Sequence, residues 1–178
     1  MYNKAIELRT ERLRIVCVDL EMMLLLKQGN QEKQFESKMG YSIHKVEGLE
    51  KELNDQFCSL ALENQEHQVW FRLWDIVLLQ NNQRIGGALF KGGPNQKGEV
   101  EIGYGIDDEF QGQGYAKEAI GCIIQWAMRQ EGVAAVIAET EKDNIASHKV
   151  LQHIGMKRYS ETETAYWWRY SKNEKESR

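Results

Sequence analysis

The segment from Glu99 to Ala116 (EVEIGYGIDDEFQGQGYA) constrains the fold of this chain most, because it joins a strand, a turn and the start of a helix. Apolar residues alternate with glutamate and glycine over 99–106, which is the period of a β-strand. Gly112 and Gly114 follow, and an apolar helical pattern begins after them. A helix start has free backbone N–H groups and partial positive charge, and glycine lets an anion approach the backbone. The segment therefore predicts an anion site, although a plain tight turn has the same glycines.

The glycines do not match the better-known phosphate loops. No Lys-Ser or Lys-Thr pair follows them, so the segment is not a P-loop, and the third glycine of a G-x-G-x-x-G fingerprint is missing. A second landmark lies further along the chain, where Asn144 and Ser147 precede an apolar helical pattern that ends at Gly155. The two segments together indicate the class of protein more specifically than either segment does alone.

Three segments together resemble the GNAT superfamily of acetyl-CoA-dependent N-acetyltransferases, and its RimJ/RimL-like branch in particular. Residues 10–15 (TERLRI) resemble the opening strand of that branch, residues 101–116 its coenzyme motif, and residues 144–156 its N-x-x-S…G-F motif. The resemblance spans roughly residues 8 to 170, without insertions between the segments.

The sequence departs from the family pattern in two places. Met156 stands where an aromatic residue is usual, and residues 107–109 lack a proline that is common there. Residues 28–71 match the family only loosely, which leaves the acceptor substrate open.

The resemblance implies an α+β fold with a mixed sheet. We expect a single GNAT-like domain over 1–170, with a central, mostly antiparallel sheet, one splayed parallel strand pair and flanking helices. The residue pattern agrees, because the strand–helix–strand unit from Val100 to Glu139 places two strands parallel. Residues 171–178 form a charged C-terminal tail.

Periodicity and capping residues predict the other elements. Asp19 and Asn144 are expected to cap helices, Asn81-Asn82 to form a turn, and 28–41 is polar and ambiguous. The predicted strands are 13–17, 69–79, 84–90, 133–139 and those within 157–170, and the predicted helices are 20–27, 46–60, 115–130 and 145–154.

By the resemblance, the coenzyme lies in the gap between the splayed strands. Main-chain groups would pair with the pantetheine arm, the glycine loop would take the diphosphate, and one side chain would contact the arm from the other side. Lys117 and Lys149 could offset the phosphate charge, or they could be ordinary solvated lysines. The residues assigned to coenzyme binding are Tyr104, Gly105, Ile106, Gln111, Gly112, Gln113, Gly114, Tyr115, Ala116 and Asn144.

Acetyl transfer from a thioester to an amine requires a proton acceptor, a donor to the oxyanion and a proton donor to the leaving sulfur. By the resemblance, Glu101 is the candidate base, acting directly or through water, and Ser147 is the candidate acid. Glu101 could instead face solvent, as Glu99 is expected to, and Ser147 could be an ordinary first-turn serine. His148 is expected at the surface.

Composition limits the other classes of function. The 178 residues carry a formal net charge of −4, which argues against nucleic acid and is compatible with a cationic amine. The three cysteines are widely spaced and odd in number, so we expect free thiols rather than disulfides or a metal cluster. With no targeting segment or long apolar run, the protein is expected to be cytoplasmic and not membrane-bound, as a monomer or homodimer.

The sequence therefore predicts an N-acetyltransferase with acetyl-CoA as co-substrate, no metal, and a small-molecule or peptide amine as acceptor. The alternative is a non-catalytic acyl-CoA-binding module, regulatory or for interaction, that keeps the coenzyme groove. The presence of both Glu101 and Ser147 favours the enzyme.

Overall fold

The structure is a computed structural model that describes residues 6–171. An eight-stranded sheet has the order β1-β2-β3-β4-β5-β6-β8-β7. Its strands are β1 (Ile6–Arg9), β2 (Leu13–Cys17), β3 (Trp74–Leu78), β4 (Gln83–Phe90), β5 (Glu99–Ile106), β6 (Ala135–Glu141), β7 (Lys157–Glu161) and β8 (Ala165–Ser171). The helices are α1 (Leu20–Lys27), α2 (Glu32–Met39), α3 (Gly48–Glu63), α4 (Tyr115–Ala127) and α5 (Ile145–Ile154), with the 3₁₀ segments η1 (Gln65–Phe71) and η2 (Asp108–Phe110).

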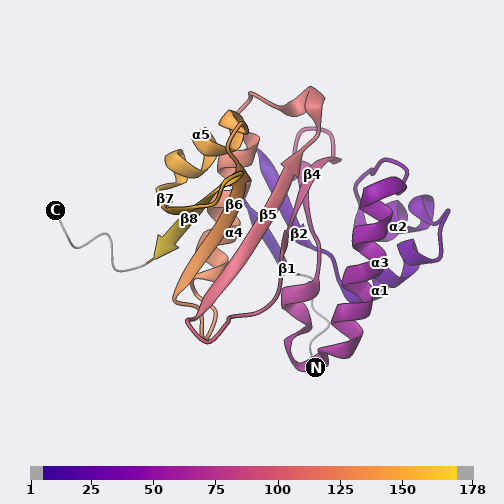
Figure 1. Ribbon diagram of the computed structural model, residues 1–178. Coiled ribbons are helices and arrows are strands. Elements are labelled where there is room, and N and C mark those ends of the chain that lie inside the picture. The colour runs from indigo at the N-terminus through magenta and orange to yellow at the C-terminus, as the bar shows by residue number, and fades with distance from the viewer. Residues whose placement is uncertain (1–5, 172–178) are drawn as a thin grey trace.

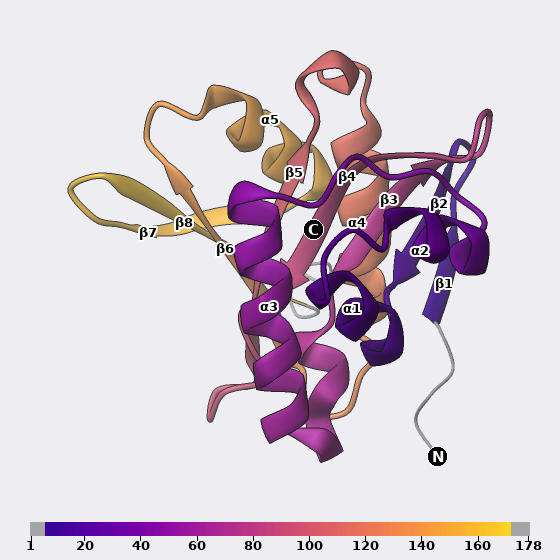
Figure 2. The ribbon, with the colours of Figure 1, turned by 90° about the vertical axis from the view of Figure 1, so that its right-hand side faces the viewer.

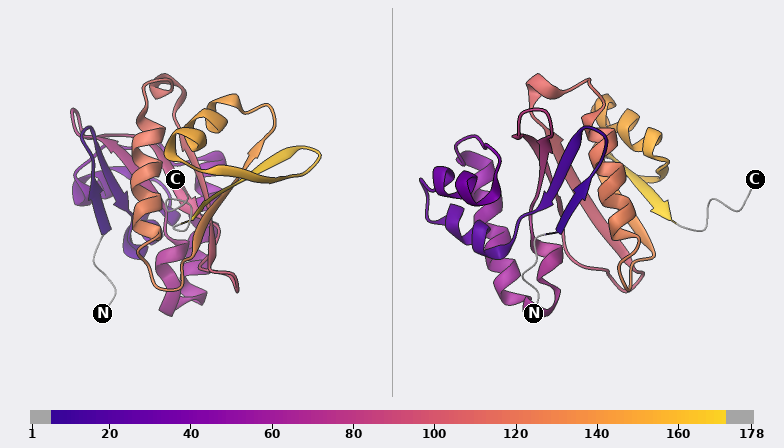
Figure 3. Two further views of the ribbon diagram at one scale, coloured as in Figure 1. Left: turned by 90° about the vertical axis from the view of Figure 1, so that its left-hand side faces the viewer. Right: turned by 180° about the vertical axis from the view of Figure 1, so that it is seen from behind.

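Helices cover both faces of the sheet. Figures 1 and 3 show α1–α3 grouped on one side and α4 and α5 on the other. The α4 face buries the larger core, which includes Trp74, Ile120 and Leu151. The α1–α3 face buries a second core around Phe35 and Phe57. These two apolar layers hold a twisted sheet between helices, as the predicted α+β class requires.

One strand pair differs from all the others in the sheet. β5 and β6 run parallel, whereas every other neighbouring pair is antiparallel. Their pairing covers only Glu99–Ala135, Val100–Val136 and Glu101–Ile137, although β5 continues to Ile106 and β6 to Glu141. Figure 2 shows the two strands diverging toward the end that carries η2. The splayed parallel pair of the sequence prediction is confirmed.

The predicted helix caps are confirmed by their hydrogen bonds. The Asp19 side chain accepts from the Met22 N–H (2.9 Å) at the start of α1. The Asn144 side chain accepts from the Ser147 N–H (3.0 Å) at the start of α5, which ends in a left-handed Gly155.

Residues 28–79 differ most from the sequence prediction. The ambiguous segment 28–41 contains α2, whose only fully buried side chain is Phe35. The strand predicted over 69–79 starts only at Trp74, because η1 turns Trp70 inward, with its ring centroid 5.1 Å from that of Phe90. Local periodicity missed both features, since long-range packing determines them.

Other expectations fall at the chain ends. The predicted tail 171–178 lies outside the described residues except for Ser171, which ends β8. No helix within residues 6–171 is long and apolar enough to cross a membrane.

Phe35→Ala tests the second core. Phe35 is fully buried and packs edge-to-face on Tyr41 with ring centroids 5.7 Å apart, so removing it leaves a cavity. We expect the free energy of unfolding in urea to fall by about 3–5 kcal/mol. The control Leu62→Ala removes a side chain that is 44% exposed and should change it by about 0.5 kcal/mol. Equal losses in the two variants would contradict the assigned packing.

Candidate active site

The glycine loop and the start of α4 form an open cradle of backbone N–H groups. Gly112 and Gly114 have φ angles of +74° and +84°, which favour glycine. No side chain among the described residues caps α4 at its N-terminus, so the first N–H groups of the helix stay free for a ligand. Gln111 braces the loop by donating from Nε2 to the Ile106 carbonyl (2.8 Å) and to Asp108 (3.0 Å).

Arg12 is a residue of this loop that sequence reasoning missed. It lies between β1 and β2, yet its Nη1 donates to the Gln113 carbonyl (3.0 Å) and its Nε to Glu118 on α4 (2.8 Å). Its guanidinium also lies over the Tyr115 ring, 4.5 Å from the centroid. The available signal was the TERLRI segment, where Arg12 was only part of a family motif.

Glu118 fixes this arrangement by accepting several hydrogen bonds. Burial alone would raise the pKa of Glu118, but bonds from the Thr10 hydroxyl and from Arg12 outweigh burial and hold that pKa below its usual value. The charged form of Glu118 is therefore favoured, and Arg12 has a permanent anionic partner beside the loop. Lys117 and Lys149 are exposed on α4 and α5, and no ion pair is described for either.

The ladder between β4 and β5 decides which backbone groups face the opening. The Lys91 N–H donates to the Glu101 carbonyl and the Asp107 N–H to the Ile85 carbonyl, both at 2.9 Å. In an antiparallel ladder these hydrogen-bonded pairs alternate, so Gly105 also pairs with β4, while Tyr104 and Ile106 turn their backbone toward β6. Of the three predicted pantetheine contacts, Gly105 therefore lacks free main-chain groups on that side.

Tyr104 and Ser147 meet at the opening. The Tyr104 hydroxyl is buried, and its one polar neighbour among the described residues is the Ser147 hydroxyl. Burial raises the pKa of this phenol, and the adjacent Ser147 hydroxyl opposes the rise only in part. Ser147 is held in the first turn of α5 by the Asn144 cap. The sequence identified Ser147 but not the Tyr104 side chain.

His148 is buried, and the expectation that it lies at the surface is wrong. Its side chain stacks near Tyr166 and Trp168, and Nε2 lies 2.9 Å from the Glu141 carbonyl. A carbonyl can only accept, so Nε2 carries the proton. His148 is buried because the side of α5 that carries it packs against β6 and β8.

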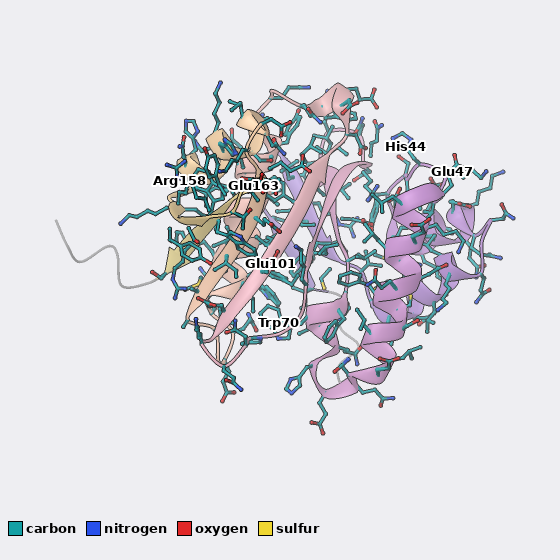
Figure 4. All side chains as sticks on the ribbon, viewed as in Figure 1. His44, Glu47, Trp70, Glu101, Arg158 and Glu163 are labelled. Atoms are coloured by element: carbon teal, nitrogen blue, oxygen red, sulfur yellow. The ribbon has the colours of Figure 1, made fainter. Side chains whose placement is uncertain are left out.

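Glu101 lies at the point where β5 and β6 stop pairing, and Figure 4 shows it well away from His44 and Glu47 at the start of α3. It forms an ion pair with Lys91, and its side chain is 20% exposed. Glu99, expected to face solvent, is instead paired with Arg169 and 12% exposed. The structure thus brings Glu101 to the opening, with a cation beside it.

A cleft of about 1060 Å³ lies between α3 and strands β3–β5. Its floor lacks side chains at three glycines, and a Cβ added to Gly105 would meet no atom within 4 Å. Apolar side chains of α3 and β4 form the walls, and Lys91 lies at one end, next to Glu101. The three glycines of the floor are Gly87, Gly103 and Gly105, and a fourth, Gly86, also lines the cleft.

Within residues 6–171 no group of three or more His, Cys, Asp or Glu side chains is arranged to hold a metal ion. Cys17, Cys58 and Cys122 are free thiols. The polar groups described at the site are backbone groups, carboxylates and hydroxyls.

Comparison with known proteins agrees with this geometry. A family model described as an acetyltransferase (GNAT) domain matches residues 15–157. The uncharacterized N-acetyltransferase YjdG of Bacillus subtilis is 31% identical over 150 residues, which cover 83% of this chain and 88% of YjdG.

Solved structures share the fold at low sequence identity. The ribosomal-protein-S5-alanine acetyltransferase of Vibrio fischeri aligns with a TM-score of 0.70 and 15% identity over 95% of this chain and 98% of that one. RimL, the ribosomal L7/L12 α-N-protein acetyltransferase, in complex with coenzyme A, aligns with a TM-score of 0.65 and 14% identity over 94% and 98%.

The family match over residues 15–157 includes the strand pair, the loop and both helices of the site, and the YjdG alignment covers 83% of the chain. On this evidence the chain belongs to the GNAT family of N-acetyltransferases and is a transferase.

Proposed function

We propose that the protein transfers an acetyl group from acetyl-CoA to a primary amine, by direct attack in a ternary complex. The observation that carries the proposal is the gap between β5 and β6, which opens after Glu101 and Ile137. The gap lies between an apolar cleft on the α3 side and the N-terminus of α4. Two substrates can therefore reach the same point from opposite faces of the sheet.

The coenzyme would bind from the α4 side. The free N–H groups at the start of α4 suit its diphosphate, and Arg12, itself paired with Glu118, holds the loop through the Gln113 carbonyl. The backbone of Tyr104 and Ile106 faces the gap and can pair with the pantetheine arm. Coenzyme A bound to RimL, which shares this fold, supports the assignment.

The acceptor amine would enter through the cleft. A protein α-amine has a pKa near ~8, so roughly a tenth of it is neutral at pH 7. A lysine amine has a pKa near ~10.4, so its neutral fraction at pH 7 is far smaller. Glu101, directly or through water, takes the proton of the attacking amine. A carbon–nitrogen bond forms, the thioester carbon–sulfur bond breaks, and the thiolate needs a proton.

We infer that Tyr104 and Ser147 supply the proton to the thiolate. The phenol remains protonated because burial raises its pKa, and its hydroxyl has no other described partner. Ser147 can relay or position this proton but is a weak acid alone. We therefore extend the proposed role of Ser147 to the pair.

Gly114→Val tests the coenzyme loop. Valine is strained at a φ of +84°, its Cβ would contact Arg12 Nη2 at 3.4 Å, and its side chain would obstruct the diphosphate. In calorimetric titration we expect acetyl-CoA affinity to fall at least about tenfold, while NAD and ATP bind neither protein. The control Gly121→Ala lies within α4, where an added Cβ meets only Ile154 at 3.9 Å, and should bind normally. Normal binding by Gly114→Val would refute the loop assignment.

Glu101→Gln tests the base. Loss of the proton acceptor should lower kcat by roughly 10²-fold or more in a thiol-release assay, with acetyl-CoA affinity unchanged. Glu99→Gln is the matched control, because Glu99 lies on the same face of β5 but pairs with Arg169. Unaltered turnover of Glu101→Gln at every pH would remove Glu101 from the mechanism. Turnover also separates the enzyme from the non-catalytic module, which would bind acetyl-CoA without releasing thiol.

Tyr104→Phe and Ser147→Ala test the proton donor. Each should lower kcat by roughly 10-fold to 10²-fold, and the double variant should lose little more than the worse single one if the two act as a unit. Because the phenol pKa is raised, wild-type kcat should show no loss from this group below about pH 10. Full additivity of the two losses would contradict the pair.

A further inference from the structure

The far end of the acceptor cleft is acidic, and this charge is not used by the mechanism above. Glu50, Asp75 and Asp107 line that end around the single guanidinium of Arg84. Arg84 Nε lies 2.7 Å from Asp75 Oδ1, and Nη2 lies 2.7 Å from Glu50 Oε1. Three carboxylates line this end beside one guanidinium, and together these four groups have a net negative charge.

The three carboxylates differ in how many hydrogen bonds and ion pairs their oxygens already make. Asp75 accepts from Arg84 and also from the buried Tyr41 hydroxyl (2.6 Å), so each of its two oxygens already has a donor. Asp107 has a buried Oδ2 that accepts no described hydrogen bond, and His44 Nε2 is 3.8 Å from it. Glu50 remains 38% exposed toward the cleft, with one contact to Arg84. Glu50 and Asp107, with side chains 38% and 34% exposed, are thus the two carboxylates of this end that a ligand can approach.

A buried amide adds an independent observation. Asn54 follows Glu50 by one turn of α3, lines the same cleft, and is 2% exposed. Its Nδ2 donates to the Met23 carbonyl (3.0 Å), which fixes the amide orientation, and its Oδ1 accepts no described hydrogen bond. An unsatisfied buried acceptor is costly, so it indicates a missing donor.

The unpaired side-chain oxygens of Asn54 and Asp107 are both acceptors. A ligand that satisfies them must bring hydrogen-bond donors and positive charge, as an ammonium or guanidinium group does. Burial and the neighbouring Asp75 and Asp107 raise the pKa of Glu50 more than Arg84 lowers it. A second cation would relieve this repulsion among the carboxylates.

The position of the acidic end sets the length of the ligand. Under the proposed function the acetyl group lies beside Tyr104, and Asp107 follows three residues later, directly after β5 ends at Ile106. At about 3.3 Å per residue this separation is about 10 Å. Between the two points the cleft is lined by glycines and by apolar side chains such as Leu53 and Leu89.

We propose that the acceptor carries a second cationic group, joined to the acetylated amine by an apolar spacer of about 10 Å and bound by Glu50 and Asp107. This inference rests on the proposed function and names the substrate class of the same site. The shared chemistry fits a free aliphatic diamine or a peptide N-terminus followed by a basic side chain.

The test uses an octane chain with an amine at one end and an amine, a hydroxyl or a carboxylate at the other. The wild type should show a kcat/KM for the diamine at least about tenfold above that for the amino alcohol, and lowest for the amino acid. Asp107→Asn and Glu50→Gln should each reduce this preference several-fold. Glu47→Gln is the control, because Glu47 precedes α3, is 68% exposed and pairs with Lys45.

Equal kcat/KM for the diamine and the amino alcohol, or a preference that survives both variants, would overturn the inference. The amino alcohol lacks the second cation, so its acetylation tests the proposed function alone. Failure of the proposed function can therefore be distinguished from failure of this inference. If acetyl-CoA does not bind, calorimetric titration of the protein with the diamine still tests the acidic end as a cation site. Diamine binding that Asp107→Asn weakens would support the site, and absence of diamine binding would reject it. A lysine-containing peptide and its norleucine counterpart then separate the peptide source from the free diamine.

Discussion

The short parallel ladder between β5 and β6 is the constraint on which the rest of the site depends. Three residue pairs hold the strands together, and beyond Glu101 and Ile137 the strands diverge. The divergence leaves the backbone of Tyr104 and Ile106 unpaired in the sheet, admits the first turn of α5, and places Ser147 next to a buried phenol. A fully paired sheet would be more regular, but it would separate the two faces completely.

The two faces of the sheet have different chemistry because their sequences differ in kind. On the α4 side, branched apolar side chains pack into a continuous core. On the α3 side, β4 and β5 present Gly87, Gly103 and Gly105, so the strands supply no side chains there to fill the space beneath the helix, and a cleft remains. The same strand β5 thus supplies a packed core through one set of alternate residues and an open floor through the other.

Local patterns predicted much of the fold. Alternation defined β5, and the caps Asp19, Asn144 and Gly155 located three helix ends. What the patterns could not supply depends on contacts between distant residues. Trp70 leaves the predicted strand because it packs on Phe90, and His148 is buried because β8 covers it.

The candidate site shows the same division. The glycine loop and Ser147 are visible as motifs, since each lies within a few residues of a helix start. Arg12 is not, because its partners Gln113 and Glu118 are more than a hundred positions away. The acidic end of the cleft is equally hidden, as Glu50, Arg84 and Asp107 come from three separate elements.

The Arg12 contacts have a consequence for how the molecule responds to its coenzyme. Arg12 belongs to the β1–β2 hairpin at the edge of the sheet, while the groups it holds belong to the loop and to α4. A ligand that orders the loop therefore also strengthens the attachment of the N-terminal hairpin, and by reciprocity a loosened hairpin weakens the ligand. Under the proposed function, binding of the coenzyme and attachment of the β1–β2 hairpin to the sheet edge are therefore thermodynamically coupled.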